Sequence, residues 1–155
     1  MEDGMKCERM LVTAGEYPFD VWAEIRAVGD DIDIIVGGGE KPHIGGVALA
    51  EPAVTVHPVT GETVSADEGT ESGFSRIAVL SAAGHKDVAI AEMFAATFCS
   101  EFGVRVAAGS GVHIDDATEE MIEQLMDTCS TLLGKSLEAW RSAQIEGTLS
   151  EHADH

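Results

Sequence analysis

The sequence predicts an α+β fold, a two-layer sandwich in which an antiparallel-rich sheet is covered by two helices. Apolar and polar residues alternate over 19–28, the period-two pattern of a half-buried strand. Ile90, Phe94 and Phe98 recur at helical spacing in one segment, and a wider apolar stripe does so over 121–140. Each amphipathic helix has to bury its apolar face, and a sheet provides the surface for both.

Strands are expected mainly in the first half of the chain. Alternating or apolar runs predict them at 19–28, 32–36, 46–50, 54–56, 76–81 and 104–107. A Gly-Asp-Asp turn at 29–31 joins the first two into a hairpin. The third strand is interrupted by Glu-Pro at 51–52, where we expect a bend or an edge position. Residues 57–75 show no periodicity and predict a long loop.

Capping signals mark the ends of both helices. Gly103 follows the first apolar face and is expected to be its C-terminal cap. Asp116 and Glu119 have the spacing of a capping box, which predicts that the second helix begins at Ala117. Gly134 lies within the second stripe and is expected to interrupt it.

Length and charge limit the function. The 155 residues, 45% hydrophobic and 24% charged, suggest one globular α+β domain over 1–145 and a disordered tail over 146–155. Nine Lys and Arg residues against 28 Asp and Glu residues give a net charge of -19. Such a surface repels nucleic acid and anionic membranes, so neither is an expected partner.

The three cysteines, Cys7, Cys99 and Cys129, have no metal-ligand spacing, and their odd number argues against a disulfide framework. Cys99 and Cys129 fall on apolar helix faces, where free cysteine packs as a small hydrophobic residue. The first nine residues lack the apolar core of a signal peptide, and no apolar run reaches the roughly 18 residues of a membrane span. We therefore expect a protein of the reducing cytoplasm.

A glycine-rich stretch at 37–46 reads Gly-Gly-Gly-Glu-Lys-Pro-His-Ile-Gly-Gly. Glycines allow backbone N–H groups to approach an anion closely, and Lys41 and His43 add charge and hydrogen-bond donors. The spacing matches neither a P-loop nor a dinucleotide fingerprint. The stretch is thus a candidate binding loop, with a purely structural turn as the alternative.

Two further stretches combine glycine with histidine. Gly84-His85-Lys86 lies at a predicted strand-to-helix junction, where free N–H groups and the helix dipole favour a phosphate. In the stretch 111–115, His113 and Asp115 share one face if the chain is extended. Singly, such histidines and aspartates serve as caps or surface groups. Together the three stretches predict loops that converge on one ligand at one end of the sheet.

Metal binding is an alternative for the histidines. His43 and His113, with Glu40 or Asp115, would form a mixed nitrogen and oxygen site for a divalent or hard cation. No HxH or HExxH spacing supports that site. A serine nucleophile has less support, since no serine lies in a nucleophile elbow.

The three stretches resemble a known family. Residues 38–45, 84–87 and 111–115 are similar in order and spacing to the small accessory proteins that accompany gallate and hydroxybenzoate decarboxylases. These are the LpdD-type prenylated-flavin chaperones. The resemblance runs from about Phe19 to about Leu133 and leaves out the tail and the acidic stretch 67–71.

The resemblance implies a non-catalytic chaperone that binds reduced prenylated FMN as a small oligomer and assists its delivery to a UbiD-type decarboxylase. The cofactor phosphate is expected near Gly84-His85-Lys86 and near the glycine-rich stretch 37–46, which we call the central loop. The apolar stripe of the last helix suits a homodimer. The implied cofactor contacts are Gly38, Gly39, Glu40, Lys41, His43, Gly45, Gly84, His85, Lys86, His113 and Asp115. Two alternatives stay open: a metal-dependent hydrolase using His43 and His113, and a decarboxylase accessory protein that binds no flavin.

Overall fold

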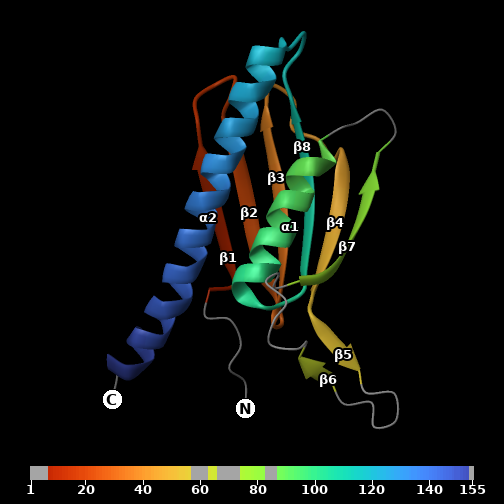
Figure 1. Ribbon diagram of the computed structural model, residues 1–155. Coiled ribbons are helices and arrows are strands. Elements are labelled where there is room, and N and C mark those ends of the chain that lie inside the picture. The colour runs from red at the N-terminus through yellow and green to blue at the C-terminus, as the bar shows by residue number, and fades with distance from the viewer. Residues whose placement is uncertain (1–6, 57–62, 66–73, 83–86, 154–155) are drawn as a thin grey trace.

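The computed structural model describes residues 7–56, 63–65, 74–82 and 87–153 (Figure 1). One layer is a six-stranded sheet of β1 (Arg9–Ala14), β2 (Val21–Val28), β3 (Asp31–Gly39), β4 (Gly46–Pro52), β7 (Phe74–Ser81) and β8 (Val106–His113). The other layer contains α1 (Val88–Phe102) and α2 (Glu119–Ala153). A separate two-stranded sheet pairs β5 (Val54–Val56) with β6 (Thr63–Ser65). The predicted α+β sandwich is confirmed.

The strand order is β1-β2-β3-β8-β4-β7, and every neighbouring pair is antiparallel except β3 and β8. Because β3 and β8 are parallel, their carboxyl ends meet at one edge of the sheet, where Gly39 pairs with His113. Strand β8 is inserted between β3 and β4, although these two are consecutive in this sheet along the chain. The connection from β3 to β4 must therefore pass the end of β8.

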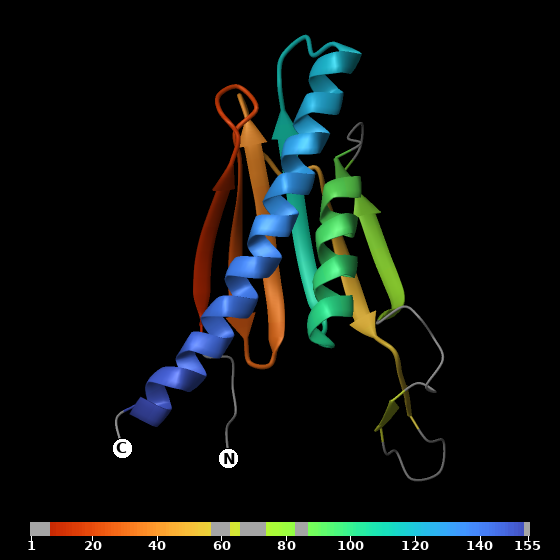
Figure 2. The ribbon, with the colours of Figure 1, turned by 60° about the vertical axis from the view of Figure 1, so that its left-hand side comes forward.

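Both helices cover the same face of the sheet (Figure 2). Helix α1 packs on β4, β8 and β7, and α2 packs on β1 and β2. Alternate strand residues point into this layer, as the period-two pattern predicts. The largest fully buried side chains are Trp140, Phe94, Phe98, Ile25, Ile32, Ile34, Ile90 and Leu132. Most of the apolar stripe of α2 is thus buried or half-buried, although Ile122 remains 50% exposed.

The helix ends differ in part from the prediction. Gly103 is a left-handed cap with φ 65°, and its N–H donates to the Cys99 carbonyl, as expected. The predicted capping box is wrong, because Asp116 has φ 52° and the Thr118 hydroxyl accepts the Met121 N–H instead. Helix α2 continues through Gly134 without interruption, so that expectation is also wrong. It is helical to Ala153, so the segment predicted as a tail begins inside a helix.

Four strands extend beyond their predicted ranges, β4 and β7 by two residues and β3 and β8 by more, and two strands were missed. Strand β8 continues to His113, and β3 includes three glycines. The prediction ended both strands too early because glycine contributes no apolar periodicity, although it pairs readily between two strands. Strand β1 had no predicted counterpart, and β6 falls within the predicted loop 57–75. The predicted irregularity at 51–52 is confirmed by a register shift between β4 and β7.

The cysteines behave as expected at two positions. Cys99 and Cys129 are buried, and all three cysteines are free. Burial raises the pKa of the Cys129 thiol to about 11, so it stays protonated at neutral pH. In the part of the chain that the structure describes, no helix has both the length and the apolar character of a membrane span.

Removing buried apolar volume from α2 should destabilise the fold. Leu132→Ala deletes a fully buried side chain, and we expect a loss of about 2–5 kcal/mol in the free energy of unfolding. Ile145→Ala is the control, because Ile145 lies on the same helix but is 55% exposed, and its effect should stay within about 0.5 kcal/mol. Urea unfolding followed by circular dichroism measures both. Equal losses would contradict the packing of α2 on the sheet.

Candidate functional site

The connection between β3 and β4 crosses over the end of β8. The N–H groups of Glu40 and Lys41 donate to the His113 carbonyl at 2.7 and 3.2 Å. Further along, the His43 N–H donates to the Gly111 carbonyl at 3.3 Å. The Gly45 N–H then donates to the Ser110 carbonyl at 2.7 Å, where β4 begins. This hydrogen-bonded passage holds the predicted central loop in place.

Two glycines make the crossing possible. A Cβ at position 111 would lie 2.0 Å from the carbonyl oxygen of His43, closer than any side chain allows. Gly39 has φ 73°, and a Cβ there would lie 2.4 Å from the His113 carbonyl oxygen. Gly111 was expected in a ligand-binding loop, but it lies inside β8 and its role is to let the main chain pass. Gly38 also allows a close approach of the main chain, since a Cβ there would lie 2.5 Å from the Asp20 carbonyl oxygen.

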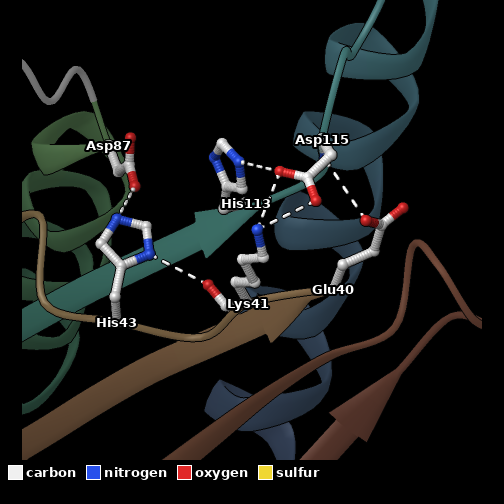
Figure 3. Close-up of polar contacts among 6 residues, drawn as sticks. All are labelled: Glu40, Lys41, His43, Asp87, His113 and Asp115. Atoms are coloured by element: carbon white, nitrogen blue, oxygen red, sulfur yellow. Dashed lines mark hydrogen bonds and ion pairs between the residues drawn. The ribbon is translucent and has the colours of Figure 1, made fainter.

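Six side chains from three parts of the chain meet at this edge of the sheet and form what we call the polar cluster (Figure 3). The crossing segment supplies three of them, and the start of α1 and the end of β8 supply the others. Its members are Glu40, Lys41, His43, Asp87, His113 and Asp115. The predicted meeting of the first and third stretches is therefore observed.

Asp115 is the centre of one half of the polar cluster. The Lys41 Nζ lies 3.1 Å from its Oδ1 and 3.0 Å from its Oδ2, and the His113 Nε2 lies 3.0 Å from its Oδ1. The hydrogen bond from Lys41, and secondly the one from His113, lower the pKa of the Asp115 carboxyl. The Asp115 N–H also donates to Glu40 Oε2 at 3.4 Å. This half of the cluster is open to solvent, since the Asp115 side chain is 50% exposed.

His43 and Asp87 form the other half. The His43 Nε2 lies 2.9 Å from Asp87 Oδ2, and its Nδ1 lies 3.0 Å from the Lys41 carbonyl oxygen. Each ring nitrogen thus lies close to an oxygen atom. Asp87 makes no side-chain cap on α1, although it occupies the N-cap position. Gly45 leaves room for this pair, because a Cβ there would lie 3.0 Å from the Asp87 carboxylate.

Ser110 of β8 links the polar cluster to the start of α1 through its side-chain hydroxyl. Its buried hydroxyl donates to the Asp87 carbonyl at 2.7 Å and accepts the Ala91 N–H at 3.0 Å. From the sequence, serine is weighed only as a nucleophile, and these hydrogen bonds of Ser110 between β8 and α1 are not predicted. Asp87 was also left out of the predicted site. The signal for Asp87 was its place directly after Gly84-His85-Lys86 at a helix start.

The two histidines do not form the predicted metal site. Their rings are 6.2 Å apart in an edge-to-face arrangement, and each has a different carboxylate partner. Among the residues that the structure describes, no group of three or more His, Cys, Asp or Glu side chains is arranged to hold a metal ion. Gly84, His85 and Lys86 lie outside the described residues, so their role in the site stays a prediction.

An apolar cavity of about 340 Å³ lies beside the polar cluster. It opens between the end of β8 and the first turns of α2, on the helix side of the sheet, and Asp87 and His113 belong to both features. The remaining lining residues are Val112, Ile114, Ala117, Ile122, Leu125 and Met126. A carboxylate and an imidazole thus stand at the rim of an apolar space, and a few polar groups around an apolar space are the usual composition of a cofactor pocket.

A family model described as a prenylated flavin chaperone LpdD-like domain matches residues 15–141. The chain belongs to this family. The resemblance expected from the three glycine-histidine stretches is therefore confirmed, and the polar cluster lies within the matched part of this LpdD-like chaperone domain.

No curated protein was found to match the chain. Among solved structures, a chaperone complex for yeast 20S proteasome assembly is similar, with a TM-score of 0.54 and 12% sequence identity. The alignment covers 88% of this chain and 97% of that chain. At this sequence identity the similarity shows only that the two proteins share a fold.

Because the chain crosses so close to Gly111, adding a single methyl group at this position should destabilise the fold strongly. In Gly111→Ala the new Cβ collides with the His43 main chain, and we expect a loss of about 2 kcal/mol or more in the free energy of unfolding. Gly134→Ala is the matched control, since nothing lies within 4 Å of its Cβ and alanine favours the helix by about 1 kcal/mol. Urea unfolding compares them. A neutral Gly111→Ala would show that His43 does not pass over Gly111.

The hydrogen bond from Lys41 should be visible in the titration of Asp115. Lys41→Ala removes the main cause of the lowered pKa, so the Asp115 pKa should rise towards its ordinary value of about 3.9. Because the folded pKa is the lower one, this contact stabilises the fold above about pH 4 and is lost as the pH falls through the lowered pKa. Carbon-detected NMR of the carboxyl group measures the shift, with Lys135→Ala as control. An unchanged Asp115 pKa in Lys41→Ala would refute the pair.

Proposed function

We propose that this family member binds reduced prenylated FMN at the polar cluster and assists its delivery to a UbiD-type aromatic acid decarboxylase, without catalysing a reaction. The family match over residues 15–141 carries the flavin-chaperone role. The observation that supports the location is that two members of the polar cluster, Asp87 and His113, also line an apolar cavity. A phosphorylated, largely aromatic cofactor needs both kinds of surface.

The phosphate is the part of the cofactor for which the polar cluster provides donors. Lys41 is 65% exposed and His113 48%, so both can reach a ligand from solvent. On a chain with a net charge of -19, such donors are needed to hold an anion. Gly84, His85 and Lys86 directly precede Asp87 in the sequence and remain proposed phosphate contacts.

The ring system is proposed to occupy the cavity lined by β8 and α2. Its volume of about 340 Å³ falls in the range of small-molecule pockets. Its walls are aliphatic apart from Asp87 and His113. Burying the apolar ring there would supply affinity, while the polar cluster at the rim would fix the orientation of the phosphate.

A chaperone also has to release its cofactor, and the polar cluster suits release. Lys41 and His113 are already paired with Asp115, so a phosphate has to compete with a carboxylate for both. Ion pairs between half-exposed groups contribute little net free energy, so the competition can go either way. Binding through such groups is reversible, as transfer to a decarboxylase requires.

Two further parts of the proposal concern the surroundings of the protein. We place the function in the reducing cytoplasm, where the three free cysteines remain thiols. We also propose that the protein acts as a homo-oligomer, as the resemblance to the LpdD-type chaperones implies.

Anaerobic titration with reduced prenylated FMN tests the site. We expect Lys41→Ala and His113→Ala each to weaken binding about tenfold or more, because each removes a charge-assisted hydrogen bond. Lys135→Ala is the matched control, since Lys135 contacts the Thr13 carbonyl, away from the polar cluster, and should bind like the wild type. Undiminished affinity in both cluster variants would refute the proposed phosphate site. A wild-type protein that binds the decarboxylase but no flavin would instead support the accessory-protein alternative.

A further inference from the structure

The second face of the sheet is apolar at its centre and has no partner among the described elements. Both helices lie on the opposite face (Figures 1 and 2). A groove of about 390 Å³ runs across β3, β8, β4 and β7 on the uncovered face. Val47 is 44% exposed, Leu49 38% and Leu80 71%, and Ile35 and Gly109 complete its floor. Contiguous exposed apolar surface of this kind marks an interaction site.

The charges on this uncovered face are balanced. Four of the five arginines of the chain lie there, at or near the ends of the strands. Each is paired with a carboxylate of the same face: Arg9 with Glu24, Arg26 with Asp33, Arg76 with Glu51, and Arg105 with Glu51 and Asp31. Four positive and four negative groups thus cancel, whereas the whole chain carries -19.

From this we propose that the uncovered sheet face binds a second copy of the same chain, in an isologous dimer with the two sheets face to face. Two copies that each carry -19 repel one another over most of their surface. The uncovered face is where they can approach, because it is neutral and its paired charges of both signs are self-complementary under a two-fold axis. The inference rests on the self-association proposed above and names its surface.

The size of the face fits a stable dimer. Six strands at about 4.8 Å spacing and seven residues at about 3.3 Å rise give a face of roughly 700 Å² in projection. A standard interface buries about 800 Å² on each partner. The sequence pointed to the apolar stripe of the last helix as the dimer surface, but Leu125, Cys129, Leu132 and Trp140 of that stripe are buried within the chain. The sheet face is the alternative that the fold leaves open.

The dimer would also bring a second chain to the cofactor site. The side chain that Gly111 lacks would point to the uncovered face, because its neighbours Ser110 and Val112 are buried beneath the helices. The main chain of His43 occupies that position, so the crossing segment lies on the uncovered face. Its Ile44, 65% exposed, lines the groove. Contact with a second copy would therefore reach the segment that carries Lys41 and His43.

Light scattering after size-exclusion chromatography tests the surface. We expect the wild type at twice its 16.3 kDa mass at micromolar concentration, and Leu49→Glu at the monomer mass, because it places a charge in the apolar centre. Leu80→Glu is a second variant on a more exposed strand and should weaken the dimer at least tenfold by sedimentation. Ile145→Glu is the matched control on α2 and should remain dimeric. Circular dichroism establishes that each variant folds.

The outcomes separate the two claims. A monomeric wild type would refute self-association, and the uncovered sheet face would then be a candidate binding surface for a different protein. A dimeric wild type in which both Leu49→Glu and Leu80→Glu remain dimeric would refute this surface alone. Neither result depends on flavin affinity, which the titration of the Lys41 and His113 variants measures separately.

Discussion

The carbonyl oxygen of His43 occupies the space where a side chain at position 111 would begin. This close passage follows from the topology, because β8 is inserted between β3 and β4 and the chain has to cross its end. The crossing brings Lys41 and His43 next to His113 and Asp115, which are some 70 residues away in the sequence. Without a glycine at 111 the segment would have to take another path, and the polar cluster would not form.

The basic groups of the polar cluster already have partners within the chain. Its lysine and its two histidines each lie against a carboxylate, Asp115 or Asp87, so each of these basic groups already has an acidic partner within the chain. An anionic ligand bound at the proposed site would have to compete with these carboxylates. A permanent cofactor site would bury its charges more deeply, whereas a chaperone has to give up what it carries.

The two faces of the sheet are suited to different tasks. The helix-covered face holds the core, and the cavity beside α2 opens from its edge. The uncovered face is apolar in the centre and charge-balanced towards the strand ends. The crossing segment carries Lys41 and His43 of the polar cluster and lies against the uncovered face. Cofactor binding and association of two copies would therefore meet at the same short stretch of chain.

The sequence by itself determined the elements whose signal is local: the period-two strand β2, the amphipathic helices, the Gly103 cap and the residue types of the site. Six of the eight residues of glycine-rich β8 were not predicted, because glycine carries no apolar periodicity and only the neighbouring strands on both sides define it as a strand. Tertiary structure alone decided that Gly111 is a crossing point, that Asp87 pairs with His43, and that the histidines take separate partners. These are contacts between segments far apart in the chain, and local pattern contains no information about distance in space.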